Sequence, residues 1–308
     1  MTDGVATPLA PPVLAVPTGR RQDRRRLQWS SVPLMAPAAI LLLGLFLAPV
    51  GFSFYLGLTN LELVGPTATN YQFTGSANLN TLINDPIFFQ SLYLTAFFVI
   101  GSGVIGATVV GLTLAMAMRG ALALTRLLVG TIVIVCFMLP PITVAMVWYA
   151  ASTSGGTLTT LFGSPNSDFL HSFPMVLVSA ANTWSLTGLA MLLFGAALRN
   201  ISEEVMESAK LESATAAQRF FRITLPLLRP TILTTVLLMT LLSLANFTII
   251  YIMTAGGPGN STMILPVYSY QQAFQFTHLA YGALIGDAMV LLATIVSFFY
   301  VRVSRARV

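Results

Sequence analysis

The chain has 308 residues, of which 56% are hydrophobic and only 8% are charged, and its net charge is +5. A soluble globular domain carries roughly 25% charged residues, so this composition excludes an ordinary soluble protein and indicates one that lies in a membrane. The single cysteine, Cys136, excludes an intrachain disulfide bond.

Residues 1–30 form a proline-rich stretch that ends in a run of arginines. Prolines at positions 8, 11, 12 and 17 argue against a packed element there. The stretch is long, and the apolar run that follows exceeds the core of a typical cleaved signal peptide. We therefore expect a disordered basic tail over 1–30 and a membrane domain over 31–308.

Six apolar runs are long enough to cross a bilayer, which takes about 20 helical residues. The alternation over ~10 residues that is typical of barrel strands is absent, so the runs predict helices. The sequence thus predicts an all-α integral membrane protein with six transmembrane helices, at about Val32–Leu58, Gln90–Met118, Leu127–Ala151, Met175–Leu198, Pro230–Ala255 and Tyr281–Val303.

The positive charges orient these spans. All fifteen Lys and Arg fall on one side of the predicted membrane, while the opposite loops, 59–89, 152–174 and 256–280, contain none. The positive-inside rule then places both termini and residues 199–229 in the cytoplasm of a multi-pass plasma (inner) membrane protein. Cytoplasmic loops beside anionic lipid account for the net charge, so we predict the lipid bilayer and no nucleic acid as a partner.

The sequence lacks the motifs of several kinds of catalytic centre. No P-loop, GxSxG, HExxH or CxxC is present, and the two histidines, His171 and His278, lie far apart. We therefore predict no catalytic residue, no metal site, no cofactor and no enzymatic activity. If the chain drives uphill transport, the energy comes from an ion gradient or from another subunit.

Few polar side chains lie within the predicted spans. Asp287 is the only acidic residue in a span, which makes it a functional candidate, with a satisfied hydrogen-bonded pair as the alternative. In the fifth span, Thr231, Thr235, Ser243 and Asn246 fall within roughly one third of the helix circumference. Such a polar stripe either lines an aqueous path or bonds a neighbouring helix.

Two of the outer loops have features of their own. Residues 78–89 read as a short amphipathic segment that breaks before Pro86. The loop from Gly256 begins with a turn and continues into aromatic residues, as a surface lying on the membrane or as a docking face. In the second span, Ser102 and Gly106 form a small-residue pair that predicts close helix packing.

The cytoplasmic stretch 199–229 is longer than a simple reversal between two spans requires. Three glutamates, at 203, 204 and 207, lie early in a helical segment, where the helix dipole favours carboxylates, and Ser202 is a candidate N-cap. Phe220, Phe221 and Ile223 supply apolar anchors. The segment therefore either docks on a protein partner or rests on the membrane surface.

One spacing within this stretch resembles a known motif. Glu207-Ser208-Ala209-x3-Ser213-x9-Ile223-x-Leu225-Pro226 is similar to the EAA motif, Glu-Ala-Ala-x3-Gly-x9-Ile-x-Leu-Pro, of membrane subunits of binding-protein-dependent ABC importers. Two residues depart from it, Ser208 for Ala and Ser213 for Gly. The family glycine sits at a sharp turn between two short helices, a turn that serine accommodates poorly.

Further matches resemble the carbohydrate-importing branch of that family. They are Phe73-x-Gly75-x2-Asn78-Leu79, Leu139-Pro140 with Trp148, and Tyr251-x2-Thr254-x-Gly256-Gly257-Pro258-x3-Thr262 followed by Ala273-Phe274. Together the resemblance covers about residues 33–302.

The resemblance implies a type I ABC importer permease fold and a set of partners. These are a second, homologous permease subunit, two ATP-binding subunits and an extracytoplasmic solute-binding protein that delivers a sugar. Residues 199–229 would form the loop that couples ATP hydrolysis to alternating access, with Glu207 near a basic group of an ATPase subunit. ATP hydrolysis would then lie outside this chain.

A second hypothesis concerns the solute path. Sugars need hydrogen-bonding partners and stack on aromatic rings, so Ser243, Asn246, Phe247, Tyr251 and Asp287 are the candidates for contacting one. The alternative function is an ion-coupled secondary transporter, which often shows internal repeats and several buried charges. The sequence has no convincing repeat and one acid within a span.

Overall fold

The computed structural model describes residues 32–305, so the tail predicted for 1–30 lies outside the described residues. The described chain is helical, apart from connecting segments and one isolated antiparallel bridge between Thr59 and Phe73. It divides into two units, residues up to Gly51 and residues from Phe52 onward. The first unit holds α2 (Val32–Leu42), η1 (Leu43–Leu47) and the start of α3 (Ala48–Gly57).

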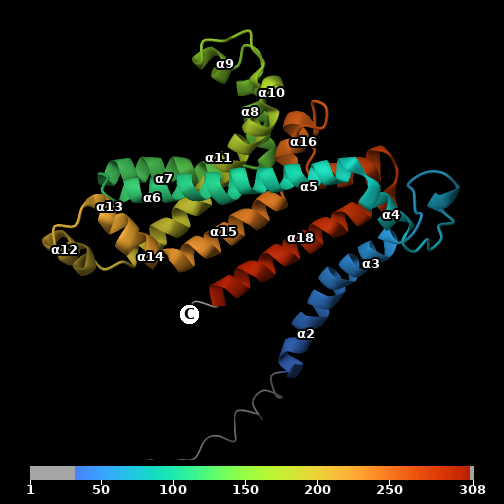
Figure 1. Ribbon diagram of the computed structural model, residues 1–308, viewed down its shortest axis with the longest axis horizontal. Coiled ribbons are helices and arrows are strands. Elements are labelled where there is room, and N and C mark those ends of the chain that lie inside the picture. Colours follow the sequence, from blue (N-terminus) through green and yellow to red (C-terminus); the bar gives the residue numbers. More distant parts are fainter. Residues whose placement is uncertain (1–31, 306–308) are drawn as a thin grey trace, which may run out of the picture. The chain divides into compact units, whose positions relative to one another are not determined.

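The second unit holds all remaining helices (Figure 1). Its first half contains η2 (Pro66–Ala68), α4 (Ala77–Asn84), α5 (Pro86–Phe98), the π-helical η3 (Val99–Ala107), α6 (Thr108–Arg119), α7 (Ala123–Met138), α8 (Pro141–Ser152), α9 (Thr157–Leu161) and α10 (Phe169–Ser172). Its second half contains α11 (Pro174–Arg199), α12 (Glu203–Leu211), α13 (Ala216–Arg219), the π-helical η4 (Phe220–Thr224), α14 (Leu225–Leu227), α15 (Arg229–Leu244), α16 (Thr248–Thr254), α17 (Leu265–Tyr270), the π-helical η5 (Gln271–Gln275) and α18 (Leu279–Arg305).

Within residues 32–305, four continuous helices are long and apolar enough to cross a membrane, namely Met35–Gly57, Pro86–Arg119, Pro174–Arg199 and Leu279–Val303. Two further pairs of helices pass the same test but are sharply bent, namely Ala123–Met138 with Pro141–Ser152 and Ala216–Leu227 with Arg229–Leu244, so the count reaches six when each pair is one span. The prediction of an all-α membrane protein with six spans is confirmed. Its first, second, fourth and sixth spans are continuous helices.

The predicted third span is not one straight helix. α7 and α8 meet at an angle of 105° across a short break. Pro140 and Pro141 explain the break, because proline lacks a backbone N–H and disfavours helical geometry in the residue before it. Accordingly, Leu139 is extended, with φ −64° and ψ 136°.

The predicted fifth span, 230–255, is also interrupted. α15 ends at Leu244 and α16 begins at Thr248, and the residues between them contain no proline. The Asn246 side chain stabilises the interruption by accepting a hydrogen bond of 3.3 Å from the backbone N–H of Ile249. Periodicity alone did not reveal this break, because the residues on both sides are apolar and helix-forming.

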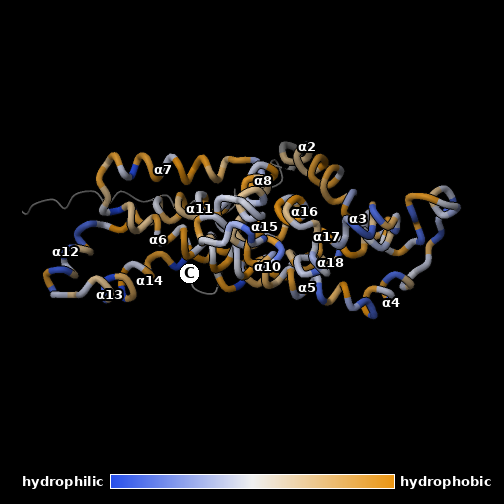
Figure 2. The backbone as a smooth tube through the Cα atoms, turned by 90° about the horizontal axis from the view of Figure 1, so that it is seen from above, coloured by the Kyte–Doolittle hydropathy of each residue, from blue (hydrophilic) through white to orange (hydrophobic). Residues whose placement is uncertain are grey.

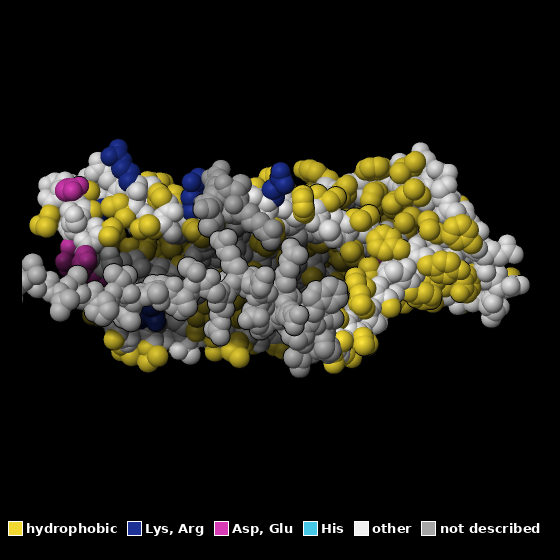
Figure 3. All heavy atoms as spheres, turned by 90° about the horizontal axis from the view of Figure 1, so that it is seen from below, with side chains coloured by type: hydrophobic (Ala, Val, Ile, Leu, Met, Phe, Trp, Pro, Cys, Tyr) yellow, Lys and Arg dark blue, Asp and Glu magenta, His cyan; other side chains and the backbone are white. Residues whose placement is uncertain are grey.

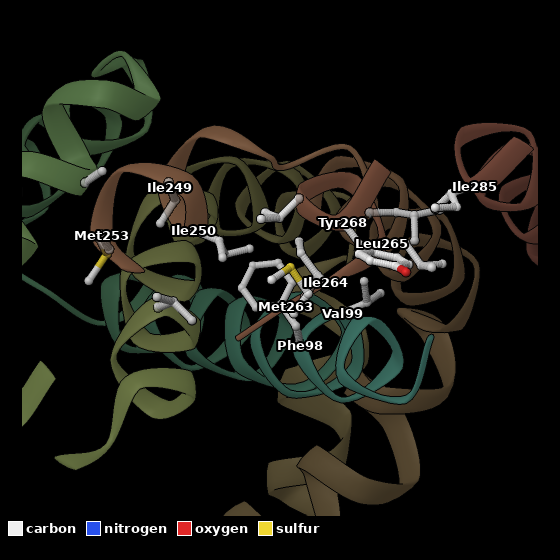
Figure 4. Close-up of a cluster of buried hydrophobic side chains, with 14 of the residues drawn as sticks. Phe98, Val99, Ile249, Ile250, Met253, Met263, Ile264, Leu265, Tyr268 and Ile285 are labelled. Carbon is white, nitrogen blue, oxygen red and sulfur yellow. The ribbon is translucent and has the colours of Figure 1, made fainter. Parts of the chain in front are cut away.

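Helix α11 lies at the centre of the second unit, where it packs against η3, α6, α7 and α15. The shorter helices α8 and α16, which follow the two interruptions, pack against each other. A buried apolar cluster joins α5, α16, α17 and α18 through side chains such as Phe98, Ile250, Leu265 and Ile285 (Figure 4). The two broken spans are therefore held by side-chain packing rather than by continuous helices.

Close packing of η3 depends on missing side chains. A Cβ atom on Gly103 would lie 2.8 Å from the backbone oxygen of Met239 in α15 and would also overlap the side chain of Ser243. A Cβ on Gly106 would overlap the side chain of Thr183 in α11. The predicted close packing around Ser102 and Gly106 is confirmed.

Two motif residues in the connecting loops donate side-chain hydrogen bonds to nearby backbone carbonyls. The Asn78 amide donates to the carbonyl oxygens of Gly57 at 2.9 Å and Thr59 at 2.7 Å. The Thr262 hydroxyl donates to the Gly257 carbonyl at 2.9 Å. The predicted break before Pro86 is confirmed, because α4 ends at Asn84 and α5 begins at Pro86.

Candidate functional site

The segment predicted to couple to an ATPase is polar and projects a helix, α12, away from the apolar bundle. Figure 2 shows α12 as largely hydrophilic and α7 as largely hydrophobic. On the face drawn in Figure 3, the Asp and Glu side chains gather at the end where α12 lies. Ser202 occupies the predicted N-cap position, but its side chain makes no capping hydrogen bond.

The turn after α12 has the geometry that the motif glycine would provide. Ser213 has φ +58°, in the left-handed region. Its N–H donates to the Lys210 carbonyl at 3.0 Å, and the N–H of Ala214 donates to the Ala209 carbonyl at 3.0 Å. These two bonds form a Schellman motif with Ser213 at the position that glycine usually takes. The sharp turn is therefore kept despite the serine.

A second short helix follows at once. Thr215 begins α13 with a capping box, in which its hydroxyl accepts from the Gln218 N–H at 3.3 Å and the Gln218 side chain accepts from the Thr215 N–H at 2.8 Å. Local hydrogen bonds therefore set the end of α12 and the start of α13.

Burial divides the motif into an anchoring part and an exposed part. Ala209 is buried, and Ile223 and Leu225 are half-buried. Met206 packs against the buried cluster formed by α6, α11 and α15. The residues of the motif that remain exposed are Glu207, Ser208, Ser213 and Pro226. Two large apolar side chains of the same segment, Leu211 and Phe221, are 86% and 63% exposed.

A buried polar network centred on Asn182 joins three spans. The Asn182 amide donates to the Ser102 hydroxyl in η3 at 2.7 Å and to the Ser243 hydroxyl in α15 at 2.9 Å. The Asn246 amide, at the interruption of the fifth span, donates to Asn182 Oδ1 at 2.8 Å. Asn182 and Ser243 are fully buried, and the network supplies the hydrogen-bond partners that buried polar side chains need.

These contacts describe two of the candidate solute-path residues. Ser243 bonds a neighbouring helix, which is one of the two alternatives for the polar stripe. Asn246 is half-buried and holds both the network and the start of α16. Their role toward a solute stays a prediction.

The other aromatic candidates belong to a cluster of four rings. Phe247 and Tyr251 stack with centroids 4.8 Å apart, and Tyr270 lies 5.1 Å from each of them. Phe274 extends the cluster at 5.3 Å from Tyr270. The first three rings are half-buried and Phe274 is exposed, so the cluster offers ring surface next to the interruption at Asn246.

Asp287 lies apart from this cluster. It is buried, and the Ser53 hydroxyl of α3 donates to its Oδ1 at 2.7 Å. Its Oδ2 has no hydrogen-bond partner among the described residues and lies 3.4 Å from where a Cβ on Gly57 would be. The described contacts therefore make Asp287 a link between α3 and α18, and no hydrogen bond connects it to Asn246.

The outer loops contain a second carboxylate held by two tyrosines. The hydroxyls of Tyr268 and Tyr281 both donate to Asp85 Oδ2, the latter at 2.6 Å, and Asp85 caps α5 by accepting from the Ile87 N–H at 2.9 Å. Burial raises the pKa of Asp85, but these hydrogen bonds outweigh it and lower the pKa below its usual value. Asp85, Tyr268 and Tyr281 line a cavity of about 400 Å³, which is also lined by Glu62 and His278.

Sequence reasoning missed Asn182, although it is the hub of the buried network. The available signal was the single asparagine of the fourth span, a residue type that marks a helix-bonding or functional position in membranes. It also grouped Tyr268 with Tyr270 in one aromatic stretch, whereas the structure gives them different partners. The Tyr268 hydroxyl donates to Asp85, and the Tyr270 ring belongs to the ring cluster. Within residues 32–305, no group of three or more His, Cys, Asp or Glu side chains is arranged to hold a metal ion.

The chain is similar to several known transport proteins. It is 32% identical to a probable ABC transporter permease protein of Pyrococcus horikoshii, over 85% of this chain and 91% of that protein. It is 30% identical to a lactose transport system permease protein of Rhizobium radiobacter, over 94% and 99%, and 28% identical to a trehalose transport system permease protein of Mycobacterium tuberculosis, over 92% and 91%.

Solved structures share the fold. A chain of a bacterial ABC transporter involved in the import of the acidic polysaccharide alginate superposes with a TM-score of 0.70 at 21% identity, covering 93% of this chain and 98% of that chain. The alginate transporter in complex with its pentasaccharide-bound periplasmic protein gives 0.73 at 20% identity, over 94% and 98%.

The fold and these similarities define a membrane permease subunit of an ABC importer. The family described as binding-protein-dependent transport system inner membrane component matches residues 107–308, and this chain belongs to that family. The family is a transport component rather than a known enzyme. The comparisons favour the ABC importer over the ion-coupled transporter that the sequence left as an alternative.

Proposed function

We propose that this chain imports a sugar or sugar-like solute by alternating access, powered by ATP hydrolysis in separate subunits. The permease relatives from Rhizobium radiobacter and Mycobacterium tuberculosis are named for lactose and trehalose transport. The proposed assembly contains a second permease, two ATP-binding subunits and an extracytoplasmic solute-binding protein. Both termini and residues 199–229 would face the cytoplasm, in agreement with the positions of the fifteen Lys and Arg.

The proposed coupling element is the segment from Glu203 to Pro226. The observation that carries this proposal is the Schellman turn at Ser213, which keeps the helix–turn–helix shape of the motif where its glycine is absent. The exposed side chains Glu207, Leu211 and Phe221 would enter a cleft of an ATPase subunit. Anchoring through Ala209, Ile223 and Leu225 would transmit the movement of that subunit to α11 and α15.

Replacement of Glu207 by Lys in the assembled importer tests this coupling. We expect solute-stimulated ATP hydrolysis to fall toward the unstimulated rate, because Glu207 is proposed to lie near a basic group of the ATPase. Glu212→Lys is the matched control, since Glu212 is also exposed but occupies one of the unspecified positions of the motif. Equal stimulation in the wild type and the Glu207 variant would contradict the coupling role.

For the solute path, we propose that the ring cluster at Phe247 and Tyr251 stacks on a sugar. Asn246 would contribute a hydrogen bond where the fifth span is interrupted, and Ser243 would hold Asn246 in place through Asn182. Asp287 would contribute only indirectly, by positioning α18 against α3. Rings favour the faces of sugars because those faces are largely apolar C–H surfaces, which gain from burial against an apolar plane.

Uptake kinetics test the solute path. In transport assays with a panel of labelled mono- and disaccharides, Phe247→Leu and Asn246→Ala are expected to raise KM for the transported sugar by about tenfold, the effect of losing ~1.4 kcal/mol of binding. Phe162→Leu is the control, because that ring is 71% exposed and belongs to a different loop. Wild-type KM values in both path variants would remove the proposal, while leaving the coupling role intact.

A further inference from the structure

A cavity of about 610 Å³ lies between α6, α7 and α11, at the ends of these helices nearest to α12. It is separate from both the ring cluster and the motif turn. Its lining residues come from three spans and from the start of α12. Arg119 of α6, Arg126 of α7 and Arg199 of α11 all line it, and Glu203 is the one acidic residue among the lining residues.

The polarity of the cavity changes with depth. Each of the three helices contributes one arginine at its end and small or apolar side chains farther along, such as Ala115 in α6 and Ile134 in α7. Along α11, Gly188 lies eleven positions before Arg199, which corresponds to roughly 16 Å of helix at 1.5 Å per residue. The cavity thus combines a basic mouth with an apolar interior that runs along the membrane spans.

Between α7 and α11, the cavity is open in its middle part and closed at its inner end. A Cβ atom on Gly130 or on Gly195 would meet no other atom within 4 Å. A Cβ on Gly188 would instead lie 2.5 Å from the Val133 carbonyl oxygen, where α7 and α11 touch. A slender apolar chain can therefore lie between α7 and α11 at the level of Gly130 and Gly195.

One of the arginines is already oriented by the protein. The guanidinium of Arg126 donates from Nε to the Met118 carbonyl at 3.1 Å and from Nη2 to the Ala121 carbonyl at 3.1 Å. These bonds hold the guanidinium plane against the end of α6. Arginine presents paired N–H groups that match the oxygens of a phosphate, so a held guanidinium loses less freedom on binding one.

We propose that this cavity binds an anionic phospholipid, with the headgroup phosphate on Arg119, Arg126 and Arg199 and one acyl chain along Gly130 and Gly195. Basic pockets between spans at the membrane surface are suited to anionic headgroups. A free phosphate ion would leave the apolar interior unused. An apolar helix of another subunit would bury the arginines without partners, which is costly.

The position of the site gives the lipid a mechanical consequence. Arg199 is the last residue of α11, and the coupling helix α12 begins four residues later at Glu203. A bound lipid ties the ends of α6, α7 and α11 together beside this joint. The inference concerns a separate site, so it stands whether or not the transported solute is a sugar.

Retention of lipid by the purified importer complex tests the proposal. The complex is reconstituted in nanodiscs of phosphatidylcholine that contain phosphatidylglycerol, extracted into detergent, and analysed by native mass spectrometry. We expect the wild type to retain phosphatidylglycerol in preference to phosphatidylcholine. Arg199→Gln should weaken that retention by about tenfold or more, as loss of a charged hydrogen bond does.

A second variant separates the acyl contact from the charge. Gly195→Leu fills the open part of the cavity and is expected to displace the lipid while all three arginines remain. The matched controls are Arg302→Gln, an exposed arginine of α18, and Gly101→Leu, a glycine of η3 with no atom near its Cβ position, neither of which lines the cavity. Both controls should retain lipid like the wild type.

Four outcomes would overturn the proposal. Equal retention of phosphatidylcholine would show that charge is not recognised, and unchanged retention in both cavity variants would show that lipid binds elsewhere. Displacement of the retained lipid by millimolar inorganic phosphate, together with wild-type behaviour of Gly195→Leu, would identify a free-anion site instead. Cross-linking of a Gly195→Cys variant to a partner permease helix would show that protein fills the cavity.

Discussion

The Asn246 side-chain amide donates a hydrogen bond of 2.8 Å to Oδ1 of Asn182, which lies 64 positions earlier in the chain. This bond joins the interruption of the fifth span to the middle of the fourth. Because Asn182 also donates to Ser102 and Ser243, one buried side chain fixes the relative positions of three spans. The movement of the fourth and fifth spans during transport is therefore expected to be concerted rather than independent.

Removal of this hub should destabilise the protein strongly. Asn182→Ala would leave the Ser243 hydroxyl and the Asn246 side-chain amide without their partner, while the Ser102 hydroxyl keeps its bond to the Phe98 carbonyl. Each unsatisfied buried group costs about 1 to 3 kcal/mol. We expect a loss of roughly 2 to 4 kcal/mol, measured as a fall in the thermal unfolding temperature of the purified complex. Ser179→Ala in the same helix is the control, because the Ser179 hydroxyl is buried without a partner among the described residues and its removal should be neutral or stabilising.

The close approach of η3 to α15 predicts a position-specific effect of one methyl group. Gly103→Ala would place a Cβ 2.8 Å from the Met239 carbonyl oxygen and against Ser243, so we expect overpacking to cost about 1 to 3 kcal/mol. Gly101→Ala, two positions earlier in the same π-helical stretch, meets open space and should not destabilise. Equal melting temperatures of the two variants would contradict the packing described between η3 and α15.

The turn after α12 predicts a stabilising substitution. Ser213 adopts φ +58°, a conformation that costs a non-glycine residue roughly 1 kcal/mol. Ser213→Gly should therefore raise the unfolding temperature slightly and leave solute-stimulated ATP hydrolysis intact. Ser208→Gly, inside α12, should instead lower stability by about 0.5 to 1 kcal/mol, because glycine is unfavourable in a helix interior. A destabilised Ser213→Gly variant would mean that the serine side chain makes a contact of its own.

The Asp85 group predicts a pH dependence of stability. The pKa of Asp85 in the folded protein lies below the ordinary value of 3.8, so its contribution to stability is present above that value and is lost as the pH falls through the folded pKa. The thermal unfolding temperature of the wild type should therefore fall below about pH 4. Asp85→Asn should be less stable at neutral pH and should lack this part of the acid-induced loss.

The tyrosine partner allows a check of the same group from the alkaline side. Burial, and then the hydrogen bond to Asp85, raise the pKa of Tyr268 above its ordinary value of 10.0. Its contribution to stability is accordingly present below that value and is lost as the pH rises through the folded pKa. Tyr268→Phe should lose about 1.5 to 3 kcal/mol at neutral pH, the contribution of a hydrogen bond to a charged group. A flat acid profile in the wild type would argue against a charged Asp85.

The amino-acid sequence by itself determined the class of this protein and the number of its spans. Apolar runs are long and charges are confined to particular loops, and both properties follow from transfer of each residue between water and lipid. The resemblance of the stretch from Glu207 to Pro226 to a known motif also implied a sharp turn between two short helices, but Ser213 at the glycine position argued against that turn, and the structure shows that it forms.

Only the tertiary structure decided the angle of the bend at Pro140, the place where the fifth span breaks and what the polar residues inside the spans do. The sharp bend at Pro140 and the interruption at Asn246 leave the hydropathy pattern unchanged, since their flanking residues are equally apolar. The roles of Asn182 and of the three arginines that line the cavity depend on residues that are distant in sequence. Hydropathy is a property of single residues, whereas a hydrogen-bond network or a cavity exists only when helices from different parts of the chain pack together.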